Sequence, residues 1–131
     1  MVKDIFFFGI DAPLKREVKG NSFQNILFRI EAEHMNLAHL GAIDRELTDK
    51  ELQGLENIDL HMIPVGGYDV LNAKTAASVI SQIEPRIVIP MTHHLPNVKK
   101  KLESVEAFCK ALGSCRREAH KKFKVSRKDL P

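Results

Sequence analysis

The chain has 131 residues, of which 44% are hydrophobic and 28% are charged, as expected for one soluble folded domain over residues 1–131. A formal net charge of +3 is too small to indicate a nucleic-acid ligand, and no apolar run is long enough to predict a membrane-spanning helix. Cys109 and Cys115 have no further cysteines as partners, and the N-terminus lacks the pattern of a signal peptide. We therefore expect reduced thiols and a cytoplasmic location.

The first part of the chain predicts three strands. Residues 5–8 form a short apolar run that is typical of a buried strand, and the polar residues 11–21 predict a loop. Two further apolar runs, residues 26–30 and 35–40, predict a second and a third strand. Because the polar link between them is short, they are expected to form an antiparallel hairpin.

The second part alternates strands with helices. Thr48 and Glu51 form a predicted capping box at the start of a short helix, and residues 58–64 predict a strand. Asn72 is the predicted N-cap of an amphipathic helix that ends before Pro85. The remaining predicted elements are a strand over residues 86–90, a helix over 98–112 and an edge strand over 122–126. This order predicts an α/β (α+β) fold with a mixed sheet and helices on one face.

Histidines are the most prominent candidates for chemistry. His93 and His94 follow the strand over residues 86–90, and His39 lies at the end of the third strand. Sites in α/β proteins lie at the carboxyl ends of strands, so these three residues are candidate zinc ligands. The alternative is that they are ordinary solvated side chains. His61 lies inside an apolar strand and is expected to be a hydrogen-bonded core residue.

Two other features have both a functional and a structural interpretation. Gly66 and Gly67 follow a strand and could bind an anionic substrate group. The pattern lacks the rest of a P-loop, so a tight strand-to-helix turn is the better explanation. The basic residues between Arg116 and Lys128 could contact an anionic partner, but without interleaved aromatic residues they are expected to form a solvated face.

Several segments together resemble the metallo-β-lactamase-fold hydrolases. They are IDLHMIPVGG (residues 58–67), AKTAA (73–77), EPRIVIPM (84–91) and HLG (39–41). The resemblance is to the branch that includes the ascorbate-6-phosphate lactonase-like enzymes. It implies one half of an αββα sandwich, with a zinc-type site at the edge of the sheets.

The metal motifs of that family are incomplete in this chain. The HxHxDH motif is absent, and the aspartate expected after HLG is replaced by Ala42. The final histidine of the family's IPMH motif aligns with Thr92, which leaves His93 one residue out of register. The resemblance therefore predicts the fold but argues against a dinuclear centre built by one copy.

Two functions remain open. The first is a non-catalytic, degenerate half-domain, without cofactor, that forms a homodimer or binds a separate N-terminal-half partner to cover its sheet. The second is a zinc-dependent hydrolase of phosphoester or lactone substrates with a site completed at an interface; its ligands would be His39, His93 and His94, with Asp44 in place of the lost aspartate. No catalytic residue is assigned. The residues expected on the uncovered face are Ile5, Phe7, Ile26, Phe28, Ile87 and Ile89.

Overall fold

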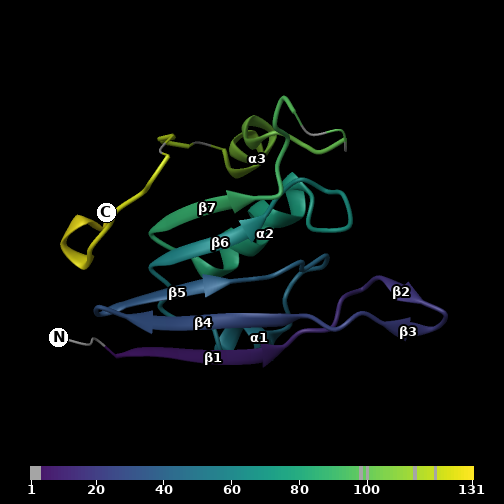
Figure 1. The fold of residues 1–131 in the computed structure, drawn as a ribbon, viewed down its shortest axis with the longest axis horizontal. Helices are drawn as coiled ribbons and strands as arrows, with labels where there is room; N and C mark the ends of the chain where they lie inside the picture. Colours follow the sequence, from purple (N-terminus) through teal and green to yellow (C-terminus); the bar gives the residue numbers. More distant parts are fainter. Residues whose placement is uncertain (1–3, 98, 100, 114, 120) are drawn as a thin grey trace.

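A five-stranded mixed sheet forms the centre of the molecule (Figure 1), in a computed structural model that describes residues 4–97, 99, 101–113, 115–119 and 121–131. The strand order is β1-β4-β5-β6-β7. β4 pairs antiparallel with β1 and β5, whereas β6 pairs parallel with β5 and β7. This arrangement confirms the predicted mixed sheet. The strands are β1 (Ile5–Asp11), β4 (Ile26–Ala32), β5 (Met35–His39), β6 (Leu60–Pro64) and β7 (Ile87–Met91).

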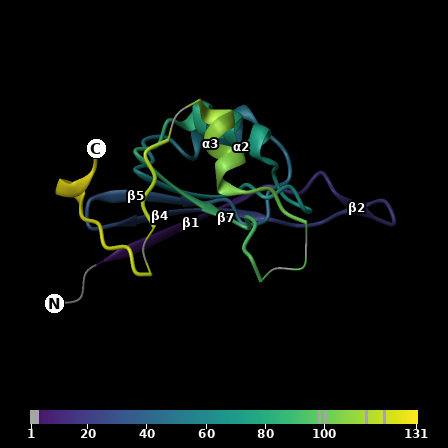
Figure 2. The same ribbon diagram turned by 90° about the horizontal axis from the view of Figure 1, so that it is seen from above.

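The three α-helices lie on the same side of this sheet (Figure 2). Helix α1 (Asp49–Gln53) begins at the predicted capping box, in which Thr48 and Glu51 exchange hydrogen bonds. Helix α2 (Ala73–Ile83) begins after Asn72, whose side chain accepts a hydrogen bond from the Thr75 N–H. Helix α3 (Val105–Leu112) packs beside α2.

The hydrophobic core lies between the sheet and the helices. Its strand residues alternate along the sequence, as the pleat requires, so that only one face of each strand contributes. Helix α2 adds a stripe of small and branched side chains, and α3 adds one buried phenylalanine. Core residues include Leu27, Ala38, Ile63, Ala76, Val79 and Phe108.

The opposite face of the sheet is also apolar. The strand pairing aligns Phe7, Ile30, Leu37, Leu60 and Ile87 in one row across all five strands. A second row consists of Gly9, Phe28, His39, Met62 and Ile89. We call this surface the open face; none of these side chains belongs to the core between sheet and helices. The open face also carries Ile5 and Ile26, so all six residues expected there lie on it.

Several strand ends shift by one or two residues from the predictions, and four differences are larger. β1 continues to Asp11, and the predicted loop over residues 11–21 contains a small hairpin of β2 (Glu17–Val18) and β3 (Asn21–Ser22). Helix α3 begins at Val105 because the Ser104 side chain caps it and the preceding Glu103 N–H is bound to the Gly66 carbonyl. Residues 122–126 form no strand, and a 3₁₀ turn (Arg127–Asp129) follows them.

The prediction of reduced thiols is wrong for this structure, because Cys109 and Cys115 form a disulfide. Gly113 follows α3 with a φ of 99°, a conformation that favours glycine, and it reverses the chain. The reversal brings the two Cα atoms to 5.4 Å, within the usual range for a disulfide. No helix in the described part of the chain is long and apolar enough to cross a membrane.

Candidate functional site

The predicted site residues gather at one end of the sheet, where the parallel strands β5, β6 and β7 end (Figure 1). His39 is the last residue of β5, Gly66 and Gly67 form the turn after β6, and Thr92 to His94 follow β7. The common direction of the three strands brings these segments to the same edge.

The turn after β6 is held by its own backbone. Any side-chain carbon at Gly66 would collide with the Thr92 carbonyl oxygen, so glycine allows the two loops to pack closely. The Gly67 N–H donates to the Leu71 carbonyl at 2.9 Å, and Gly67 has a φ of 84°. The structure therefore supports the tight-turn interpretation of the glycines, since the Gly67 donor is already used within the chain.

Glu103 connects the loops at this end of the sheet. Its N–H donates to the Gly66 carbonyl at 2.8 Å, and its own carbonyl accepts from the His94 N–H at 2.9 Å. The Glu103 carboxylate accepts a hydrogen bond from the Ala73 N–H at 2.9 Å, at the positive end of the α2 dipole. Sequence reasoning missed this residue, because it placed residue 103 inside a helix and no local motif marks so distant a partner.

His39 is held in an orientation that suits a hydrogen-bond donor better than a metal ligand. Its Nδ1 accepts a hydrogen bond from the Gly41 N–H at 3.0 Å. A neutral imidazole that accepts at Nδ1 carries its proton on Nε2. Metal-binding histidines usually show the reverse, with one nitrogen on the metal and the other donating. In this geometry His39 offers an N–H group on the open face.

His93 has the arrangement expected of a ligand. Its Nδ1 lies 3.2 Å from the His94 carbonyl oxygen, and donation there leaves the Nε2 lone pair available. His94 is exposed on the same loop. However, among the described residues no group of three His, Cys, Asp or Glu side chains could hold a metal ion. A zinc ion at His93 would need donors beyond those that one copy brings together here.

Asp44 and Ala42 have structural contacts near His39. The two Asp44 carboxylate oxygens accept the N–H groups of Lys15 and Arg16 at 2.7 and 2.9 Å. The Ala42 N–H donates to the Asn25 side-chain oxygen at 3.1 Å. Asp44 thus anchors the chain after β1. Both of its carboxylate oxygens, which a metal ion would use, already accept hydrogen bonds.

A charge pair in the segment after β5 also has a structural role. Arg45 makes two hydrogen bonds to the carboxylate of the buried Glu51, both at 2.9 Å. These bonds lower the pKa of Glu51 and raise that of Arg45, more than burial opposes. The pair joins the loop before α1 to the helix itself.

His61 lies in the core, as predicted, but it is not hydrogen-bonded. Its side chain is fully buried, and neither ring nitrogen has a partner. Burial lowers the pKa of His61 to about 4, because the charged ring would lose its hydration. Its position on β6 opposite Ala38 and Val88 places it on the helix-covered face, away from the loops described above.

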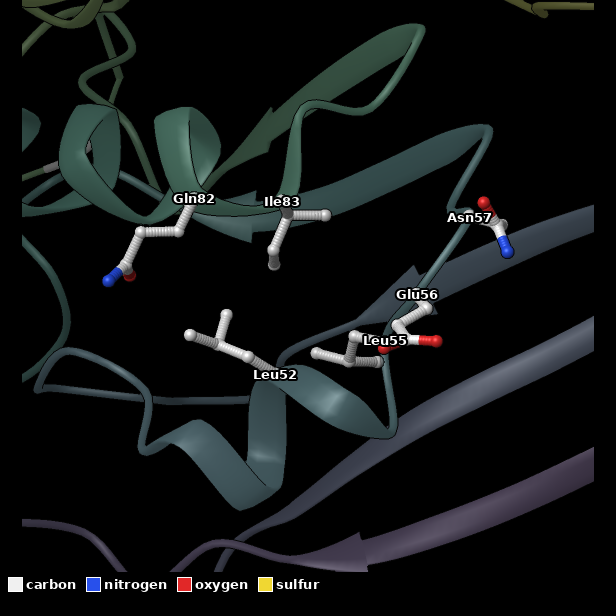
Figure 3. Close-up of a pocket in the computed structure, with 6 residues that line it drawn as sticks. All are labelled: Leu52, Leu55, Glu56, Asn57, Gln82 and Ile83. Carbon is white, nitrogen blue, oxygen red and sulfur yellow. The ribbon is translucent and has the colours of Figure 1, made fainter.

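Two hollows lie away from the strand ends. Figure 3 shows a cavity of about 240 Å³ between α1 and the end of α2, with apolar side chains at its centre. A wider groove of about 1240 Å³ lies between the β4–β5 turn and the 3₁₀ turn. Neither is lined by His39, His93 or His94. The first is lined by Leu52, Leu55, Glu56, Asn57, Gln82 and Ile83.

Comparison with known protein families gives one match over most of the chain. The family described as the beta-lactamase superfamily domain matches residues 2–92. A UPF0173 protein of Pyrococcus furiosus is 34% identical over 55 residues, which are 42% of this chain and 25% of that protein.

Solved structures give the same fold. A proposed zinc-dependent hydrolase of the metallo-β-lactamase superfamily from Thermotoga maritima matches with a TM-score of 0.69 and 27% identity, over 81% of this chain and 51% of that one. A proposed metal-dependent hydrolase from Parabacteroides distasonis matches with a TM-score of 0.57 and 16% identity, over 85% of this chain and 50% of that one. The latter likeness concerns the fold alone. This chain therefore spans about half the length of these two structures.

Proposed function

The chain belongs to the beta-lactamase superfamily, and from this membership we propose that it acts as a non-catalytic, degenerate half-domain that pairs its open face with a second copy. The observation that carries this proposal is the pair of apolar rows across all five strands. Phe7 is 64% exposed and Phe28 is 39% exposed within those rows. Contiguous apolar surface of this kind is uncommon on monomeric soluble proteins and marks an interaction site.

The donor groups at the strand ends support a non-catalytic role. His39 presents an N–H group, and the Asp44 carboxylate accepts hydrogen bonds from two backbone N–H groups. The side chain of Ala42 has no atom that could bind a metal. His93 alone has a ligand-like arrangement. Activating water with a metal requires several converging protein ligands, and this set does not supply them from one copy.

A second copy is the partner that this surface fits. Two identical open faces would bring mostly apolar side chains together, and Asp11 lies on this face only at the end of β1, beside Ile26. An isologous contact between them is closed by a two-fold axis, so a third copy cannot bind through the same face. The contact would bury Phe7 and Phe28 between two sheets. A separate partner that carries the N-terminal half is the other occupant that the experiment below distinguishes.

The proposal places this dimer in the cytoplasm, without a membrane or nucleic-acid partner. In a reducing cytoplasm the Cys109–Cys115 bond would be open. The sheet and the open face do not depend on that bond, because it only connects α3 to the segment after it.

Sedimentation equilibrium of the purified chain tests the dimer. At micromolar concentration we expect a mass of at least twice 14.8 kDa that falls on dilution. A monodisperse monomer over the same range would contradict the proposal. If the chain is a monomer but binds a separate N-terminal-half protein through the open face, that protein and not a second copy is the partner.

The alternative is a metal-dependent hydrolase with a site completed between copies. The described zinc dependence of the Thermotoga maritima relative and the resemblance to the lactonase-like branch favour it, with phosphoesters or lactones as substrates. Calorimetric titration of zinc into the chelator-stripped protein separates the two functions. We expect no saturable binding; one tight site per chain that is lost in H93A/H94A, but kept in H34A, would instead support the hydrolase.

A further inference from the structure

The outer edge of β1 is a second exposed surface, and it lies on an apolar strand. In the part of the chain that the structure describes, β1 pairs with β4 on one side and with no strand on the other. An edge strand presents a row of unpaired backbone N–H and C=O groups to any strand that approaches. Folded proteins usually protect such edges with charged residues or proline. In β1 the only such residue is Asp11 at its last position, and residues 5–10 contain neither.

Both faces of β1 are exposed, which a partner on the open face cannot explain. Phe7 points to the open face, whereas Phe6 and Phe8 lie on the helix-covered face with exposures of 54% and 48%. On this face Ile10 packs against the core and lies beside Gly54, whereas about half of the surface of Phe6 and of Phe8 is exposed. A sheet packed on the open face would therefore leave Phe6 and Phe8 in water.

We propose that β1 pairs antiparallel with β1 of a second copy, centred on Phe7, to form one continuous sheet. In an antiparallel pair, directly opposed residues point to the same face of the sheet. The two-fold axis must therefore pass through a residue of β1 and not between two residues. Centring on Phe7 places Phe6 opposite Phe8 and Phe7 opposite its own copy. Every phenylalanine of the strand then faces another, and such cross-strand aromatic pairs stabilise a sheet.

The aromatic residues, rather than the charged residues next to the strand, distinguish this register from the neighbouring one. With the axis at Phe7, Asp4 lies opposite Ile10, and no two carboxylates oppose each other. With the axis at Phe8, Asp11 would lie opposite Ile5, and Phe7 would face Gly9. Each register places one carboxylate opposite an isoleucine, so charge does not separate them. The Phe8 register loses two of the three aromatic pairs, which favours the axis at Phe7.

This contact is independent of the proposed dimer through the open face. An antiparallel strand pair has its two-fold axis perpendicular to the sheet, whereas two stacked sheets are related by an axis that lies between them. The two axes are compatible with a closed assembly of four copies. Loss of the open-face contact would leave pairs joined at β1, and loss of the β1 contact would leave stacked pairs.

Register-specific cross-linking tests the β1 contact. F6C and F8C are prepared as separate full-length variants, with the native disulfide kept oxidised, and are treated with a short thiol cross-linker alone and as an equilibrated mixture. We expect a covalent dimer several-fold more abundant in the mixture than in either variant alone, because Phe6 faces Phe8 only across the axis. F23C has similar exposure but lies off the sheet, so it measures random collisions.

A mixture that cross-links no more than F23C would overturn the proposal, and so would a stronger dimer in F6C or F8C alone, which would indicate a different register. Adding F28E to both variants separates the two contacts. The cross-link should persist there if β1 pairs as proposed, even when the open-face contact is lost. If F28E abolishes it, the β1 edges meet only as a consequence of face packing, and the β1 proposal fails.

Discussion

The two faces of the sheet are both apolar, but only one of them is covered within the chain. Leu27 and Phe28 are neighbours on β4, and their exposures are 0% and 39%. Leu27 packs under the helices, whereas Phe28 lies in a row of residues on the side of the sheet that faces away from the described helices (Figure 2). The difference indicates that the covered face provides the stability of the protomer. The open face is then available for association.

Truncation of the covered face should have the largest effect. We expect Leu27→Ala to lower the free energy of unfolding by about 2–5 kcal/mol, because it leaves a cavity in a fully packed core. Ile26→Ala, next to it on the open face, should cost far less. Urea unfolding in the F28E background measures both, so that association does not contribute. Equal costs for the two variants would show that the faces do not differ within one copy.

Acid sensitivity provides a second comparison, because His61 lies in the covered face without a partner. The pKa of His61 falls to about 4 in the folded state from 6.5, so the unfolded chain binds the additional proton between these values. Stability is therefore fully present above pH 6.5 and is lost as the pH falls toward 4. The expected loss is about 3 kcal/mol.

The measurement is urea unfolding between pH 4 and 7 for the native chain and for H61L. The H61L variant should lose the slope in this range, and H94L should keep it, since His94 is exposed. Glu51, whose pKa is lowered from 4.5, contributes at the acid end of this window and below it. An unchanged slope in H61L would mean that the ring is hydrated or hydrogen-bonded in solution.

Local sequence signals predicted most of the fold. The capping box at Thr48, the N-cap at Asn72 and the apolar runs of β4 to β7 each depend on neighbours in sequence, and the structure contains them all. The alternation of apolar residues also identified six members of the open face. These features could be predicted because strand and helix periodicities report directly on which side is buried.

The features that sequence missed depend on distant contacts. Helix α3 starts late because Glu103 is bound to Gly66, which no window around residue 103 reveals. The disulfide depends on a reversal at Gly113 rather than on a cysteine motif. The hydrogen bond from the Gly41 N–H to His39 determines which ring nitrogen is available, and spacing of histidines cannot predict that.

A matched pair of charge substitutions tests the central claim most directly. Phe28 and Phe23 have exposures of 39% and 41%, but only Phe28 lies on the open face. Sedimentation equilibrium should show that F28E halves the mass of the assembly, while F23E retains the native mass and both variants stay folded. An unchanged mass in F28E, or an equal loss in F23E, would contradict the claim that the open face is the binding surface.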